Sequence, residues 1–227
     1  MEWIMKTFYS LQRTIEASEE TPSSSAVSIL QIPGQILNDS VYQVYKPSGR
    51  PSVEIVFFHG LTLDGGMDAH WRTWLSARGS ELWLEWILQE VPNSRIVLIS
   101  YDAFAKRTSR EGIMDMYLTC ENLVQDLIDA EVGQGSCPVV LVGHSIGCLV
   151  MKELCSTLDS IPSPNERAQN LLLNVKGLFY YACPHHGSQL ADRSAGFAKG
   201  PLFEELTTLN KLVQRRNEIF RVYAHKL

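Results

Sequence analysis

The sequence contains no run of about 20 apolar residues, so it offers no candidate for a membrane-spanning helix. It also opens without the basic, apolar and small-residue regions of a secretory signal peptide, and secretion is therefore not indicated. The 227 residues carry a formal charge of -5 without a basic stripe. Nucleic acid is therefore not an expected partner.

Cysteines are few, and motifs for metals or nucleotides are missing. Five cysteines, an odd number without framework spacing, favour a reducing compartment with free thiols. Cys148, Cys155 and Cys183 are expected to pack in the core. Neither Cys-x-x-Cys nor His-x-x-x-His is present, and neither is Gly-x-Gly-x-x-Gly or a Walker loop. We therefore expect no metal and no cofactor, in an intracellular, cytoplasmic protein.

The composition that is present fits one folded domain. Apolar residues make up 45% of the chain, which is near the globular average. Residues 1–25 form an amphipathic segment followed by a Ser-rich linker, and residues 26–227 are expected to form the domain. A membrane-surface helix is one alternative for the first 17 residues, but their polar face is not strongly basic.

One short motif organises the rest of the chain. Gly143-His144-Ser145-Ile146-Gly147 has the form Gly-x-Ser-x-Gly, and it lies between an apolar run and a helical pattern. This context predicts a strand, a very tight turn and a helix, with Ser145 in the turn. Gly143 and Gly147 lie where the strand and helix come close, so a Cβ at either position would clash. Ser145 would then lie at a helix N-terminus, which favours developing negative charge.

Apolar strand patterns alternate with helical patterns along the domain, which predicts an α/β fold with a mostly parallel sheet and helices on both faces. Ligands of such sheets bind at the carboxyl ends of the strands. The expected strands are Ser28–Ile32, Val41–Tyr45, Val53–Phe58, Arg95–Ser100, Pro138–Val142, Val175–Ala182 and one that begins over Phe220–Tyr223. The expected helices are a mostly helical segment from Trp71 to Pro92, then Met116–Ala130, a helix ending near Leu158, and Leu202–Arg216.

At this point the chain resembles the α/β-hydrolases, and more narrowly the serine-active-site-containing proteins and their lipase-like relatives, serine esterases that act on lipids. The matching pieces run in order from about Val53 to Tyr223, and they are Phe57-Phe58-His59-Gly60-Leu61, Ser100-Tyr101-Asp102, Gly143-His144-Ser145-Ile146-Gly147 and Tyr181-Ala182-Cys183-Pro184-His185-His186-Gly187-Ser188. One departure is small, since Cys148 stands where the family often has a second glycine. The resemblance implies an ester or lipid substrate, peripheral membrane contact, and mitochondrial or endoplasmic-reticulum association.

The second departure is at the end of the chain. The family takes its acid and its general-base histidine from loops that follow the strand near Phe220, and this sequence stops at His225-Lys226-Leu227. We therefore expect a fold that is incomplete at its C-terminal sheet edge, which would need a partner to cover it. We also expect little ester turnover by the chain alone.

The remaining site residues have assigned roles. In this fold the oxyanion hole uses the backbone N–H groups of Ile146 and Leu61, the latter aimed by the turn at Gly60. His59 is expected to brace that loop, and His144 to pack or cap beside the serine. The alternative for His59 and Gly60 is a plain strand-ending turn.

Three further residues are candidates for lining the pocket. His185 and His186 lie at the correct sheet edge, where either is a candidate base, but loop-structuring hydrogen bonds are the favoured role. Asp102 ends a strand and is a candidate acid, helix cap or loop brace. Two functions therefore stay open: a serine hydrolase that uses Ser145, or a binding or regulatory module that lacks the acid and base.

Overall fold

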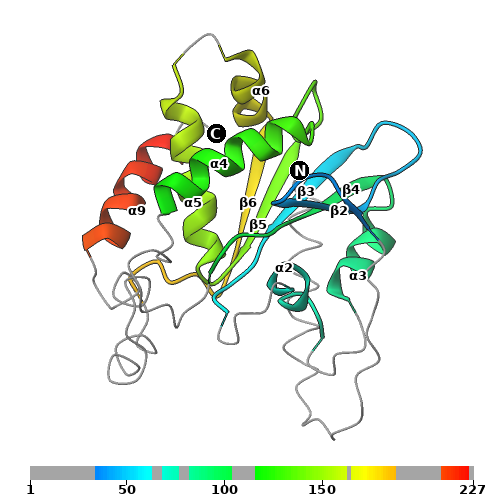
Figure 1. Cartoon of the computed structure of the whole chain (residues 1–227), viewed down its shortest axis with the longest axis horizontal. Helices are drawn as coiled ribbons and strands as arrows, with labels where there is room; N and C mark the ends of the chain where they lie inside the picture. The colour runs from blue at the N-terminus through cyan, green and yellow to red at the C-terminus, as the bar shows by residue number, and fades with distance from the viewer. Residues whose placement is uncertain are drawn as a thin grey trace, which may run out of the picture.

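A computed structural model of the chain describes residues 34–62, 68–76, 82–103, 116–162, 165–187 and 211–224. These residues form three layers, in which a twisted sheet lies between two groups of helices (Figure 1). The expected strand Ser28–Ile32 and the N-terminal segment 1–25 lie outside the described residues.

Six strands form one sheet in the order β1-β2-β4-β3-β5-β6. Their bounds are β1 Gln35–Ile36, β2 Val41–Tyr45, β3 Val53–Phe58, β4 Ser94–Ile99, β5 Val139–His144 and β6 Val175–Tyr181. β4, β3, β5 and β6 are parallel, whereas β1 and β2 form an antiparallel edge. The mostly parallel sheet predicted from the alternating pattern is thus confirmed.

The centre of the sheet explains the apolar runs in the sequence. Every residue of β3 and β4 is buried, because β3 is paired on both sides and helices cover both faces of the sheet. Strands buried in this way need apolar residues on both faces, so they read as continuous apolar runs rather than alternating ones. Phe58 pairs with Gly143, and this register brings the ends of β3 and β5 to the same edge.

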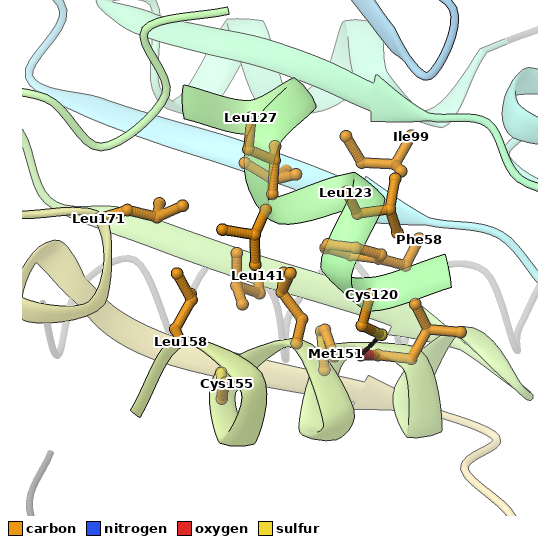
Figure 2. Close-up of a cluster of buried hydrophobic side chains, with 14 of the residues drawn as sticks. Phe58, Ile99, Cys120, Leu123, Leu127, Leu141, Met151, Cys155, Leu158 and Leu171 are labelled. Carbon is orange, nitrogen blue, oxygen red and sulfur yellow. Dashed lines mark hydrogen bonds between the residues drawn. The ribbon is translucent and has the colours of Figure 1, made fainter. Parts of the chain in front are cut away.

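Four helices cover one face of the sheet. They are α4 Met116–Asp129, α5 Gly147–Ser160, α6 Glu166–Asn174 and α9 Lys211–Ala224. α5 lies along the sheet and packs against α4, α6 and α9 (Figure 1). Figure 2 shows Cys120 of α4 next to Met151 of α5, and Leu123 and Cys155 belong to the same buried cluster. Burying these side chains holds α5, and with it the Ser145 turn, in place.

The other face carries two short helices and an aromatic core. α2 Ala69–Arg72 and α3 Trp83–Glu90 occupy the segment that the sequence predicted as mostly helical. The rings of Trp74 and Trp83 stack at 5.7 Å, and both meet Phe57 of β3 edge to face. This core covers the side of the sheet that α5 leaves open.

The end of the chain differs from the prediction. The strand expected to begin over Phe220–Tyr223 is helical and belongs to α9, while residues 202–210 of the expected helix lie outside the described residues. Val213, Asn217 and Phe220 recur at helical spacing, and Val213 and Phe220 are buried in the core that α5 shares. Helical packing therefore overrides the strand preference of the local Ile-Phe-Arg-Val-Tyr sequence.

Helix α6 is an element that the sequence analysis missed. Asn165 caps it, accepting a hydrogen bond from the Ala168 N–H at 3.1 Å. Ala168 and Leu171 face the core, and the helix runs directly into β6. β6 is the last strand of the sheet that the described residues form, and β5 is its neighbour there.

Candidate active site

Ser145 lies in the tight turn between β5 and α5, as predicted. Its φ is 52°, a left-handed conformation that a side chain disfavours. Its N–H donates to the Tyr181 carbonyl oxygen at 2.9 Å, which ties the turn to the end of β6. The predicted backbone strain is confirmed, and strain of this kind is typical of functional sites.

The two glycines of the motif permit this turn sterically. A Cβ at Gly143 would lie 2.8 Å from the backbone nitrogen of Cys148. A Cβ at Gly147 would overlap the carbonyl oxygen of Phe58 and lie 2.5 Å from that of His59. Strand β3 and helix α5 therefore touch backbone to backbone at the elbow.

The loop after β3 lies directly against the serine. A Cβ at Gly60 would lie 2.6 Å from His144 Nδ1 and 3.2 Å from Ser145 Cβ. Within the described part of the chain, the N–H groups of Leu61 and Ile146 donate no hydrogen bond. The loop that carries Leu61 thus approaches Ser145 at Gly60, and Ile146 follows the serine directly in the chain.

His59 holds this loop through both ring nitrogens. Nδ1 lies 2.7 Å from the Gly60 carbonyl oxygen, whereas Nε2 lies 3.2 Å from the carbonyl oxygen and 3.4 Å from the nitrogen of Tyr101. A neutral ring has one N–H, and the shorter contact places it on Nδ1, which leaves Nε2 to accept from the Tyr101 N–H. The Tyr101 hydroxyl donates to the His59 carbonyl oxygen, and the two rings stack at 4.1 Å. Burial lowers the pKa of His59 to about 4, so the ring is neutral.

This neutral histidine should make the protein acid-sensitive. A folded-state pKa below the unfolded value of about 6.5 means that the unfolded chain binds more protons between pH 6.5 and 4. Stability is then present above that window and falls as the pH drops through it. We expect His59 to remove about 2 kcal/mol of unfolding free energy between pH 7 and pH 5.

Urea unfolding of the wild type and of His59→Gln at both pH values measures this contribution. The variant should lose about 2 kcal/mol less than the wild type on acidification. The pKa values of His144 and His185 are also lowered by burial, but both residues remain in the two proteins and cancel in the difference. An equal acid sensitivity of the two proteins would contradict the neutral, buried state of His59.

His144 packs beside the serine rather than bonding to it. Its ring lies between Trp74, at 6.4 Å, and Tyr181, at 5.5 Å. Burial lowers its pKa, and Nδ1 is buried without a hydrogen-bond partner in the described residues. The His144 ring is therefore neutral and packs with Trp74 and Tyr181 next to Gly60.

His185 is held by a buried lysine. Its Nδ1 lies 2.7 Å from Lys152 Nζ, and its carbonyl oxygen accepts from Asn217 Nδ2. Because an ammonium group only donates, Nδ1 must present its lone pair to Lys152. Burial and the charge of Lys152 lower the pKa of His185. The accepting nitrogen of this candidate base is thus occupied by Lys152, in keeping with a loop-structuring role.

The other candidates lie further into solvent. Asp102 and His186 are both exposed at the ends of β4 and β6. Ser145 Oγ makes no hydrogen bond with any residue that the structure describes. The described residues therefore place no base on the serine oxygen.

Two participants were missed from the sequence. Lys152 is 3% exposed on α5, where it bonds His185, and Asn217 of α9 accepts from Lys152 Nζ at 2.6 Å. A signal was present for the lysine, because it interrupts an apolar stretch from Cys148 to Cys155 in a helix predicted to be buried. No local signal marks Asn217, which reaches the site because α9 packs on α5.

The strand order, the parallel centre and the strained serine between β5 and α5 together define an α/β-hydrolase fold. Within the described residues, no helix combines the length and apolar character needed to cross a membrane.

Known proteins resemble the chain in sequence. Protein SERAC1 of Bos taurus is 28% identical over 208 residues, a match that covers 81% of this chain and 30% of the bovine protein. Protein SERAC1 of Homo sapiens is 26% identical over 178 residues, covering 69% and 26%. The chain thus spans less than a third of the length of these relatives. No protein-family model matches it.

Solved structures resemble it more distantly. The Bacillus licheniformis lipase BlEst2 matches 80% of this chain and 61% of its own, with 19% identity and a TM-score of 0.38. The phospholipase PlaB of Legionella pneumophila matches 74% of this chain and 34% of its own, with 17% identity and a TM-score of 0.46.

Proposed function

We propose that this protein is a serine hydrolase that cleaves a carboxylic ester, with Ser145 as its nucleophile. The observation that carries the proposal is the φ of 52° at Ser145, held between β5 and α5. A serine in this position presents its hydroxyl at the sheet edge. Its left-handed backbone lowers the stability of the fold, a cost that an ordinary loop would not have and that is typical of functional sites.

The surroundings of Ser145 support the same chemistry. Its Oγ would attack the ester carbonyl carbon, and the carbonyl oxygen would gain negative charge. The N–H groups of Ile146 and Leu61 would donate to that oxygen, and the N-terminus of α5 adds a favourable dipole. Loss of the alcohol leaves an acyl-serine, which water then hydrolyses.

The substrate class comes from the sequence resemblance, which implies a lipid ester. An apolar side chain next to Gly60 suits such a substrate, since Leu61 is only partly buried. A larger rate with p-nitrophenyl octanoate than with p-nitrophenyl acetate would support a lipid ester. The reverse preference would favour a small ester.

An alkyl fluorophosphonate tests the nucleophile in the full 227-residue chain. We expect labelling confined to Ser145, as located by mass spectrometry of the peptides, and lost completely in Ser145→Ala. Ser156→Ala is the matched control, because Ser156 lies on the same helix and donates to the Lys152 carbonyl oxygen. That variant should label like the wild type.

A second function is favoured by one observation, the missing base on Ser145 Oγ among the described residues. Such a protein would bind an ester in the elbow and turn it over slowly or not at all. Without triad members, an oxyanion hole and binding still give roughly 10³–10⁴-fold acceleration over water. A folded chain whose Ser145 stays unlabelled would favour this binding module over the hydrolase.

A further inference from the structure

Two thiols lie together beside the Ser145 turn. Cys148 is buried in the first turn of α5, where its Sγ donates to the Gly143 carbonyl oxygen at 3.0 Å and lies 3.6 Å from that of Tyr181. Cys183 follows β6 two residues after Tyr181 and is partly exposed. Cys148 Sγ contacts the carbonyl oxygen of Tyr181, two residues before Cys183, and each thiol shifts the pKa of the other.

A buried cation lies beside this pair. Lys152 is one helical turn beyond Cys148 on α5, so the two side chains share a face. Lys152 Nζ contacts His185 Nδ1 at 2.7 Å, and the same Nδ1 lies 3.6 Å from Cys183 Sγ. Asn217 Oδ1 holds the ammonium at 2.6 Å from the other side. The cluster is therefore built from α5, α9 and the end of β6.

The two sulfur atoms differ in character. The neighbouring Cys148 thiol and the charge of Lys152 lower the pKa of Cys183, although burial opposes them. The interaction with Cys183, together with burial, raises the pKa of Cys148 well above its ordinary range. The more exposed sulfur is thus the better nucleophile, and the buried one keeps its proton.

We propose that Cys183 is a peroxide-reactive thiol and that Cys148 is its resolving partner, so that the pair is oxidised to a disulfide beside Ser145. Reactive thiols of this kind are partly exposed, lie near a cation and have a second cysteine within reach. Disulfides in reducing compartments are mostly transient and redox-sensing. This chain has five cysteines without the spacing of a structural disulfide framework, which is consistent with a disulfide of that kind.

The chemistry takes two steps with hydrogen peroxide as oxidant. The Cys183 thiolate attacks one peroxide oxygen, an S–O bond forms, the O–O bond breaks, and the leaving hydroxide takes a proton to become water. The Cys148 sulfur then attacks Cys183 sulfur, an S–S bond forms, and the S–O bond breaks. The second hydroxide takes the Cys148 proton, so two thiols and one peroxide give one disulfide and two waters.

The other three cysteines serve as internal controls. Cys120 and Cys155 are fully buried, and Cys120 donates to the Val150 carbonyl oxygen at 3.6 Å. Burial raises the pKa of Cys137 to about 11. All three should remain reduced when Cys183 reacts.

The test treats the reduced full chain with one equivalent of hydrogen peroxide, blocks free thiols, and maps the peptides without reduction. We expect a Cys148–Cys183 disulfide as the first product, reversed by dithiothreitol. In Cys148→Ser, dimedone should instead label Cys183 as a sulfenic acid. Oxidation of Cys137 or Cys155 before Cys183, or a sulfenic acid on Cys183 in the wild type with no disulfide, would overturn the proposal.

The role of the cation is tested separately. Lys152→Met should slow oxidation of Cys183 by at least about threefold, because the thiolate loses its neighbouring charge. Lys176→Gln is the control, since Lys176 is exposed on β6 and should leave the rate unchanged. Equal rates in Lys152→Met and the wild type would refute the part given to Lys152. Circular dichroism checks that each variant is folded. The disulfide mapping of the wild type does not depend on any variant.

Discussion

Replacing Gly147 by alanine should cost at least about 3 kcal/mol of unfolding free energy, and it should be among the most damaging single substitutions in the chain. The added Cβ would overlap the Phe58 carbonyl oxygen and lie 2.5 Å from that of His59. Both are backbone atoms in or next to β3, so no side chain can rotate away to make room. β3 and α5 would have to separate, which opens the core on the α5 side of the sheet.

Urea unfolding followed by tryptophan fluorescence measures this loss. Gly49→Ala is the matched control, because a Cβ at Gly49 meets no heavy atom within 4 Å. That variant should match the wild type or gain slightly, by up to about 1 kcal/mol, through a less flexible unfolded chain. A Gly147→Ala protein as stable as the wild type would contradict the close approach of β3 and α5.

Replacing Arg95 by methionine should remove about 3–5 kcal/mol, because it leaves a buried carboxylate without its partner. Arg95 and Glu54 pair in register on β4 and β3, with Nη1 and Oε1 at 3.0 Å and both side chains 5% exposed. Arg95 also donates to Gln43 Oε1 at 2.9 Å and to the Ala130 carbonyl oxygen at 2.7 Å. The change therefore disrupts a network that joins β2, β3, β4 and the end of α4.

Two comparisons isolate the charge effect in urea unfolding. The double variant Glu54→Gln with Arg95→Met should regain at least about 1 kcal/mol over Arg95→Met, because the uncompensated charge is gone. Its glutamine keeps an acceptor for the Gly133 N–H, which bonds Glu54 Oε2 at 2.6 Å. Asp129→Ala is the control at the surface, where Asp129 pairs with Arg167 at 4.0 Å and both side chains are about half exposed. It should change stability by no more than about 1 kcal/mol. A double variant that regains nothing would refute the charge explanation.

The elbow is the part of the site that the sequence predicted most fully. Gly143 and Ser145 carry local requirements, because the left-handed serine and the approach of Gly143 to Cys148 both lie within the turn. Gly147 keeps the same motif, but its close approach is to Phe58 and His59 at the end of β3. The strands on which the site depends were equally readable, since β3 and β4 are buried throughout and therefore continuously apolar.

The C-terminal helix could not be predicted in the same way. The stretch from Phe220 to Tyr223 reads as a strand by composition, yet α9 continues through it. Its side chains gain more by lying on α5, where Arg216 Nε meets Glu153 Oε2 at 3.0 Å, and Phe220 is buried. The partner helix, more than 50 residues earlier in the chain, makes that choice.

The sequence by itself determined the α/β class and the place of Ser145 in a turn between strand and helix. The turn depends on interactions within a few residues, and the α/β class depends on periodic burial. Both requirements can be recognised in the local sequence. Only the tertiary structure decided which groups surround the histidines: the Tyr101 backbone for His59, and Lys152 with Asn217 for His185. Those contacts join separate elements, and their energies depend on burial that no local pattern records.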